Sequence, residues 1–130
     1  MDTALTTISS IQTYFDSMLR GVLDDNIFFD APQQTINDAW KSFVVVDLGT
    51  EISDMNAYSG GTVRVMLYIR PISSGMSNVA LAQEKEKIFS SILKENTGGH
   101  YLLRRLANMS DFDDDTGFHV ITYILRLTIL

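Results

Sequence analysis

The sequence contains no cysteine, which excludes disulfide bridges, thiolate nucleophiles and zinc sites with cysteine ligands. Histidine is scarce as well: the sequence has only His100 and His119. His100 follows a glycine at the expected exit of a helix, and His119 lies inside an expected strand, so both contexts are typical of structural or surface residues. We therefore expect no metal site and no cofactor.

Motifs that cradle phosphates or build hydrolase active sites are missing too. Neither GxGxxG nor GxxxxGK[ST] occurs, and HExxH and GxSxG are likewise absent. One group of carboxylates is an alternative, since Asp47 at the end of an expected strand has Glu51 and Asp54 nearby. No nucleophile or metal ligand accompanies them. We expect no catalytic residue and no enzymatic activity.

Long apolar runs are absent: no stretch reaches the roughly eighteen residues that a membrane-spanning helix requires. The first residues, MDTALTTISS, carry an acid where an export signal would carry basic residues. We therefore expect neither a membrane span nor an export signal, and we expect the chain to work or assemble in the cytoplasm.

The composition is that of one ordinary globular domain, with 130 residues of which 45% are hydrophobic and 20% charged. We expect a single domain over residues 1–130. Ten basic residues against sixteen acidic ones give a net charge of −6, which argues against tight binding of a phosphate backbone by the surface as a whole. An acidic wall is compatible with a channel through which DNA passes, because like charges keep a polyanion from adhering.

Two stretches have the apolar spacing of helices. In the first, Thr7 to Leu23, apolar residues recur every three or four positions, at Ile8, Ile11, Phe15, Met18, Leu19 and Val22. The second runs from Val79 to Asn96, with Asn78 as N-cap and Gly98 just beyond its end. Its apolar face comprises Leu81, Ile88, Phe89, Ile92 and Leu93, and its water-exposed face comprises Gln83, Glu84, Glu86, Lys87, Ser91 and Lys94.

Four stretches have the composition of strands. The segment from Trp40 to Leu48 is almost continuously apolar, which predicts a strand covered on both faces. Residues 62–70, TVRVMLYIR, alternate with a period of two after a turn expected at Gly60 and Gly61. HYLLRRLANMS and TGFHVITYILRLTIL are separated by a polar turn, which indicates a hairpin. The connector at 26–38 has no period and is expected to pack its apolar residues, Ile27, Phe28 and Phe29, against the core.

The element order is therefore α-β-β-α-β-β. It predicts the α+β class, with a mostly antiparallel sheet of about four strands and two helices packed on one face.

The last strand is unusually long. From Phe118 to Leu130 the chain has an extended pattern that spans roughly 43 Å if straight, whereas a compact domain of this length has a radius of gyration of about 14 Å. Exposed apolar strands template pairing with another chain. We therefore expect a neighbouring subunit to cover this strand, and the alternative is a bent strand buried within one domain. The expected interface residues are Phe118, Val120, Tyr123, Ile124, Leu125, Leu127 and Ile129.

The acidic stretch SDFDDDTGFH precedes that strand. Asp111, Asp113 and Asp115 alternate as calcium ligands do, but an EF-hand needs glycine at the sixth position and glutamate at the twelfth. Those positions hold Thr116 and Thr122. Aspartate and glycine are also the residues that tight turns favour. We interpret the stretch as a hairpin turn whose acidic loop comprises Asp111, Asp113, Asp114 and Asp115.

The layout resembles a known family. The strand FVVVDLGTEISD, the linker and strand MNAYSGGTVRVMLYIR, an exposed helix and a final hairpin closing on an apolar strand are similar to the small tail-terminator and tail-completion proteins of long-tailed bacteriophages and prophages. The resemblance covers roughly residues 40–130 and rests on layout, since it includes no catalytic motif.

This resemblance implies a structural virion protein in the tail or neck. It implies a homo-oligomeric ring, usually a hexamer, that caps the tail tube and joins it to the head connector. The tail tube protein and the head–tail connector protein are then its partners, and DNA passes through without specific binding. The sheet would face the lumen with the helices outside, and the acidic loop would line the lumen or face a partner.

Two alternatives belong to other classes of protein. One is a small dimeric α+β ligand-binding module, in which the sheet pairs across two subunits and the ligand lies at the loop from Glu51 to Gly61. The other is a minor enzyme that uses the region of Asp47.

Overall fold

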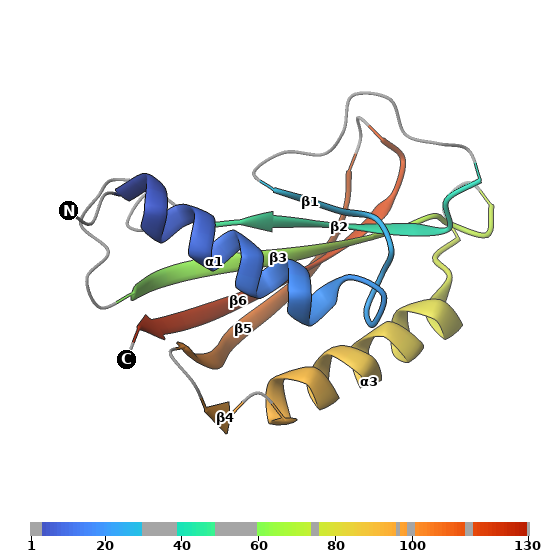
Figure 1. Cartoon of the computed structure of the whole chain (residues 1–130). Coiled ribbons are helices and arrows are strands. Elements are labelled where there is room, and N and C mark those ends of the chain that lie inside the picture. Colours follow the sequence, from blue (N-terminus) through green and yellow to red (C-terminus); the bar gives the residue numbers. More distant parts are fainter. Residues whose placement is uncertain are drawn as a thin grey trace.

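The computed structural model describes residues 4–29, 39–48, 60–73, 76–95, 97–98, 101–113 and 116–129 of the chain. Within them the order of elements is α1 (Ala4–Leu19), β1 (Ile27–Phe29), β2 (Ser42–Asp47), β3 (Gly60–Ile69), α3 (Val79–Glu95), β4 (Thr97–Gly98), β5 (Tyr101–Phe112) and β6 (His119–Ile129). The strands form one sheet with two helices on the same side of it (Figure 1).

The predicted α+β class is confirmed, but the number of strands was wrong. The described sheet has six strands in the order β1-β2-β3-β6-β5-β4. The additional strands are β1, with three residues, and β4, with two. Strands this short show no period in a sequence. β1 runs parallel to β2, and the other neighbours are antiparallel.

The first helix ends at Leu19, four residues before the predicted end. Gly21 has a φ of 78°, in the left-handed region that glycine adopts without steric cost, and the N–H of Leu23 donates to the carbonyl of Leu19 at 2.8 Å. Because the chain leaves the helical path there, Val22 is 55% exposed and does not belong to the apolar stripe. The buried stripe consists of Ile11, Phe15 and Leu19, followed by Leu23 in the turn.

The second helix has the predicted bounds to within one residue. Asn78 caps it: its Oδ1 accepts the N–H of Leu81 at 3.1 Å, which satisfies a backbone donor of the first turn. Phe89 and Ile92 are buried against the sheet, as the apolar spacing predicted. Gly98 lies in β4, where it pairs with Tyr101.

The strands β2 and β3 follow the sequence closely. In β2 the side chains of Val44 and Val46 join the core under the helices, while Phe43 and Val45 join a smaller cluster on the opposite face. The prediction that this strand is covered on both faces is therefore confirmed. The turn expected at Gly60 and Gly61 was wrong, since both residues belong to β3 and pair with the end of β6.

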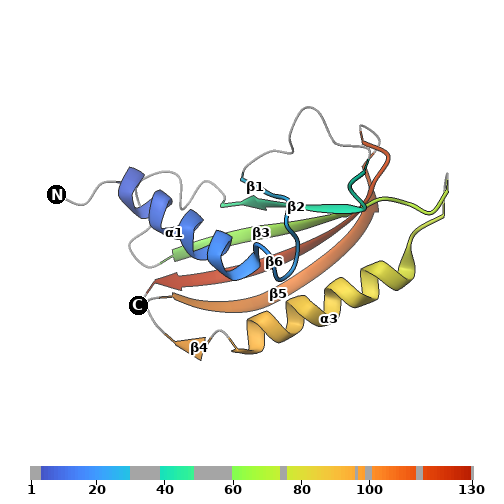
Figure 2. The ribbon, with the colours of Figure 1, turned by 45° about the vertical axis from the view of Figure 1, so that its right-hand side comes forward.

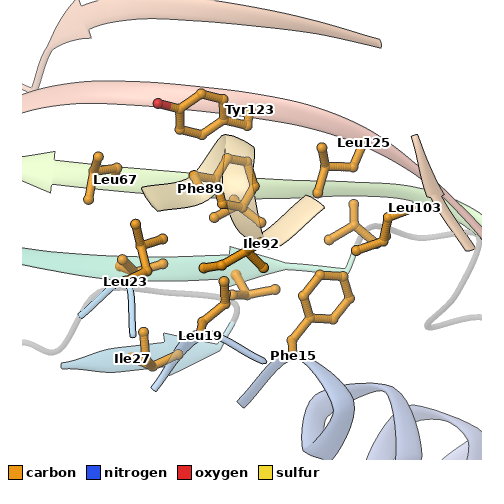
Figure 3. Packing of buried hydrophobic residues seen from close by; sticks show 14 of the residues in the cluster. Phe15, Leu19, Leu23, Ile27, Leu67, Phe89, Ile92, Leu103, Tyr123 and Leu125 are labelled. Carbon is orange, nitrogen blue, oxygen red and sulfur yellow. The ribbon is translucent and has the colours of Figure 1, made fainter. Parts of the chain in front are cut away.

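The main core lies between the sheet and the two helices. Side chains from both helices pack against side chains of the sheet, and Figure 3 shows them pointing toward one another. The helices contribute Phe15 and Leu19 of α1 and Phe89 and Ile92 of α3, and the sheet contributes Leu67, Leu103, Tyr123 and Leu125. Ile27 belongs to the same core, Phe29 packs against it and Phe28 packs against the smaller cluster, so the predicted packing of these three residues is confirmed. They form β1 and not the irregular connector that was expected, and residues 30–38 lie outside the described residues.

The smaller cluster lies on the face of the sheet away from the helices. Its buried members are Phe43, Val45, Tyr68 and Phe118. The rings of Phe43 and Tyr68 stack with centroids 4.5 Å apart, and the guanidinium of Arg70 lies 4.7 Å from the ring centroid of Phe118. The cluster covers one end of this face only, because Arg64 and Arg104 farther along it are exposed. We call this face, away from the helices, the open face.

Candidate assembly surface

The final hairpin is the longest structure in the sheet, and its last strand is internal. β6 pairs with β3 from His119 to Thr128 and with β5 from His119 to Ile129, so both of its edges are occupied. Tyr123, Leu125 and Leu127 have no exposed surface. The expectation that a neighbouring subunit must cover this strand was therefore wrong, and the alternative of burial within one domain applies.

The other predicted interface residues divide between the two faces of the sheet. Phe118 is 3% exposed in the smaller cluster, and Val120 packs against that cluster. Ile129 packs against the main core. Ile124 is partly buried on the open face, opposite Arg64 of β3 and Ala107 of β5. Of the predicted set, Ile124 is the residue best placed to meet a partner without disturbing the main core.

The neighbouring strand β5 is only partly paired on its outer side, whereas β6 is paired on both sides. Its outer edge pairs with β4 only at Tyr101 and Leu102, and from Leu103 to Phe112 it has no strand partner on that side among the described residues. All side chains from Leu106 to Phe112 are exposed, and the large apolar ones are 47% (Leu106), 55% (Met109) and 46% (Phe112) exposed. Figure 2 shows β5 curving along the lower margin of the sheet. We call the segment Leu106–Phe112 the free edge.

The opposite edge of the sheet is protected. β1 has only three residues, and the guanidinium of Arg20 occupies the backbone carbonyl of Ile27 at 3.2 Å. A second donor of Arg20 binds the carbonyl of Asp25 at 2.9 Å, and Asp16 holds the same side chain at 2.7 Å. Short edge strands and charged side chains at the edge both discourage pairing with another chain. Assembly through the sheet is therefore expected at β5.

The acidic stretch lies at the tip of the β5–β6 hairpin, as predicted, although Ser110, Asp111 and Phe112 still belong to β5. Asp113 closes the turn: its carboxylate accepts Thr116 Oγ1 at 2.8 Å, and its carbonyl accepts the N–H of Gly117 at 2.7 Å. Gly117 has a φ of 75°, which explains the glycine at this position. Asp114 and Asp115 lie outside the described residues.

The open face carries basic residues on its central and outer strands. Arg104 and Arg126 are direct cross-strand neighbours there, and Arg64 of β3 lies opposite Ile124, two residues before Arg126. Asp47 of β2 is paired with Arg64 across the strands. A lumen lined by this face would thus present guanidinium groups along with carboxylates. Burial and, second to it, the carboxylate of Asp113 raise the pKa of Tyr68, so the described part of the hairpin tip lies near the end of the open face.

A polar network fastens β5 and β6 to the second helix. Glu86 accepts hydrogen bonds from the hydroxyl of Tyr123 and from Arg105 Nη1, the latter at 2.9 Å, and Ser90 Oγ donates to it at 3.1 Å. Burial raises the pKa of Glu86, but the bonds from Tyr123, Arg105 and Ser90 together lower it below its ordinary value. Burial and the neighbouring Glu86 raise the pKa of Tyr123. The expectation that Glu86 simply faces water was wrong.

We predict that this network makes the free energy of unfolding decrease as the pH falls into the acidic range. A carboxylate whose pKa is lowered by folding stabilises the fold above its unfolded pKa of about 4.3, and that contribution is lost as the pH falls through the folded pKa. Glu86→Gln should therefore show a smaller loss of unfolding free energy than the wild type when urea titrations are moved from neutral pH to about pH 3.5. Glu84→Gln, an exposed neighbour on the same helix, is the control. Identical pH dependence in Glu86→Gln and wild type would contradict the role of the network.

A second polar cluster ties the turn after α1 to the sheet and to α3. Asp24 is buried; its Oδ2 accepts the hydroxyl of Ser42 and lies 3.5 Å from Lys85 Nζ, and its Oδ1 accepts the N–H of Asn26 at 3.0 Å. Lys85 also donates to the carbonyl of Leu23. These residues line a cavity of about 360 Å³ together with Trp40 and Lys41. Because the carboxylate already has its partners, we interpret the cluster as structural.

A groove of about 420 Å³ runs between α3 and the hairpin. Its lining residues are Ala82, Gln83, Glu86, Asn108, Met109, Ser110, Ile121 and Tyr123. The groove borders the free edge through Asn108, Met109 and Ser110, so a chain bound at that edge would also cover part of it.

The residues considered for chemistry do not come together. His119 contacts Ser110 through Nε2, its ring centroid lies 5.4 Å from that of Phe112, and its side chain is partly buried. Asp47 is partly buried beside Arg64, whereas Glu51, Asp54 and His100 lie outside the described residues. Within the described ranges, no group of three or more His, Cys, Asp or Glu side chains is arranged to hold a metal ion.

Neither described helix is long and apolar enough to cross a membrane.

No family model and no curated protein matches this chain. The candidate site therefore rests on the geometry. Sequence reasoning missed the free edge because HYLLRRLANMS shows no clear period. The signal was present in the polar residues of β5, which make up almost half of the strand: Arg104, Arg105, Asn108, Ser110 and Asp111.

Proposed function

We propose that this chain is a structural virion protein that forms a ring at the end of a phage tail tube, ends the growth of the tube and joins the tail to the head connector. The observation that carries the proposal is the free edge of β5, because an unpaired strand edge equips the molecule to take up a strand of a partner protein when it enters a larger assembly. The α+β layout with both helices on one face agrees with the family that the sequence resembles.

In the proposed ring, a homo-oligomer of about six copies, the open face of the sheet is turned toward the lumen and α1 and α3 lie outside. The guanidinium groups of Arg64 and Arg104 then lie near passing DNA, and their contacts to phosphate are independent of base sequence. The acidic hairpin tip reaches the tail tube protein or the connector protein at the rim.

The hairpin tip supplies a separate prediction. Replacing Asp113, Asp114 and Asp115 together with asparagine should leave the fold intact, because asparagine tolerates the same turn conformations. It should lower the fraction of heads that carry a tail, counted in electron micrographs of particles, since the charges meet a partner's basic groups. A normal proportion of joined particles would reduce these aspartates to turn residues.

The alternative function is a small dimeric α+β ligand-binding module. Its expected ligand loop, Glu51 to Gly61, lies almost wholly outside the described residues. The two functions are separated by particle assembly, since only the tail protein is required there.

The proposed function is tested by assembling particles without this chain. Tails should then continue to grow beyond their normal length and should remain separate from heads, and adding the purified chain to such tails should restore joining. Particles of normal tail length, joined to heads in the absence of the chain, would overturn the proposal. Purified Glu84→Gln chain, altered at an exposed site away from β5, serves as the matched positive control for rescue.

A further inference from the structure

We infer that, before it joins any larger assembly, the chain forms a two-fold dimer in which the free edge of β5 pairs with the same edge of a second copy. This inference goes beyond the proposed function, because it concerns the free protein and holds whether or not the chain ends a tail. Exposed strand edges can pair with other strands, and proline, charged side chains, a β-bulge or a covering element opposes such pairing unless the second strand matches it in charge and register. The segment Leu106–Phe112 contains neither proline nor lysine, and its side chains are exposed.

The charges of β5 make the strand complementary to itself when two copies run antiparallel. Arg104 lies just before the free edge and Asp111 near its end, and both are exposed. They also share a face: Arg104 is paired with Arg126 and Asp111 with Val120, which places both on the open face. An antiparallel copy therefore brings each Arg104 toward an Asp111 of the other chain, while a parallel copy places like charges together.

The β-bulge determines the register of this pairing. The pairing of β5 with β6 shifts between Arg105 and Ala107, so that Leu106 is the extra residue. With the two-fold axis at Asn108, Ala107 lies opposite Met109, and Ser110 lies opposite the bulge at Arg105 and Leu106. Arg104 then lies opposite Asp111 on the same face. Without the bulge, Arg105 would be the residue opposite Asp111. Arg105 points to the helix side of the sheet, where it is bound to Glu86, so it could not pair with Asp111.

A second copy fits better than an edge-to-edge chain of subunits. The other edge of the sheet, at β1, is occupied by Arg20 at the carbonyl of Ile27, so β5 of one subunit has no equivalent edge of a neighbour to extend. Closed two-fold dimers are the commonest arrangement of identical subunits. The dimer also brings Leu106 and Met109, two of the three large apolar side chains of the free edge, next to the second copy.

A single introduced cysteine tests the axis. The chain has no cysteine of its own, so Asn108→Cys supplies the sole thiol, and at the two-fold axis it meets its own copy. Mild oxidation should convert most of the protein to a disulfide-linked dimer. Ser91→Cys, on the exposed side of α3, should stay largely monomeric in a denaturing gel under the same conditions. Equal crosslinking of the two variants, or none for Asn108→Cys, overturns the inference.

Charge exchange tests the antiparallel direction. Arg104→Asp and Asp111→Arg should each weaken the dimer by about tenfold or more, measured as a dissociation constant by analytical ultracentrifugation, because each places like charges opposite one another twice. Mixing the two variants should restore a mixed dimer, since position 104 of each chain then lies opposite a residue of the other sign at position 111 of its partner. Circular dichroism verifies that both variants are folded.

Three other outcomes overturn the inference. A monomer at concentrations of tens of micromolar, a ring that neither substitution weakens, or a dimer that mixing does not restore would each show that the free edge is not paired with itself. The first result would direct the search to a strand from another protein, and the last two would direct it to another surface of this chain. If the dimer is absent but tails assemble normally with this chain, the inference is wrong and the proposed function is unaffected. If the dimer is found but the chain has no role in tails, the proposed function is wrong and the inference is unaffected.

Discussion

Replacing Leu125 with alanine is expected to lower the free energy of unfolding by about 2–5 kcal/mol, the usual cost of truncating a fully buried leucine. Leu125 has no exposed surface and lies in the main core with Leu103 and Phe89 (Figure 3). The effect should appear in urea titration as a lower midpoint at unchanged slope. The matched control is Ile124→Ala, which shortens the preceding, partly buried residue on the open face and should cost clearly less.

This pair of variants also separates the two explanations of the long last strand. If β6 were the seam between subunits, Leu125→Ala would dissociate an oligomer and leave the folded chain as stable as before. The paired strands on both sides of β6 lead to the opposite expectation. A full loss of self-association with an unchanged unfolding midpoint would contradict the placement of Leu125 in the core.

Asp24→Ala is expected to have an effect of similar size, about 3–5 kcal/mol, because removing one partner of a buried ion pair leaves the other uncompensated. Asp24 and Lys85 have side chains that are only 5% and 16% exposed, and Asp24 also accepts the hydroxyl of Ser42. The loss affects three parts of the fold, since the cluster connects the turn after α1 to β2 and α3.

Asp25→Ala is the control for Asp24→Ala, because Asp25 is the next residue along the chain and is exposed. Chemical denaturation of the two variants at neutral pH measures the difference directly. Should Asp24→Ala and Asp25→Ala unfold at the same denaturant concentration, the buried cluster has no structural role. Lys85→Met, which keeps the length of the side chain, should reproduce much of the Asp24→Ala effect if the ion pair is the main contribution.

The regular elements could be predicted from local pattern because their patterns are long. α3 combines an apolar face with a capping asparagine at Asn78, and β3 alternates strictly from Val63 to Ile69, so periodicity alone identified both. The end of α1 was less certain in principle: the apolar spacing continues to Leu23, and only the left-handed conformation of Gly21 shows where the helix stops.

The candidate site was harder to predict, because it depends on which strands are neighbours. A sequence shows that the last strand is long and apolar, but the edges of a sheet are determined by pairing between distant segments. The structure places β6 inside the sheet and leaves most of the outer edge of β5 without a strand partner among the described residues, so the unpaired edge belongs to the other strand of the hairpin. Glu86 was missed for the same reason, since its partners Tyr123 and Arg105 are distant in sequence.

Direct imaging is the most direct test of the proposed assembly of this chain at the end of a phage tail. Averaged electron micrographs of particles that carry a tagged copy of the chain should show a ring of density at the head-proximal end of the tail tube, with the tag at that ring. Particles whose tail ends lack such density, or whose tag lies elsewhere or is absent, would contradict the claim.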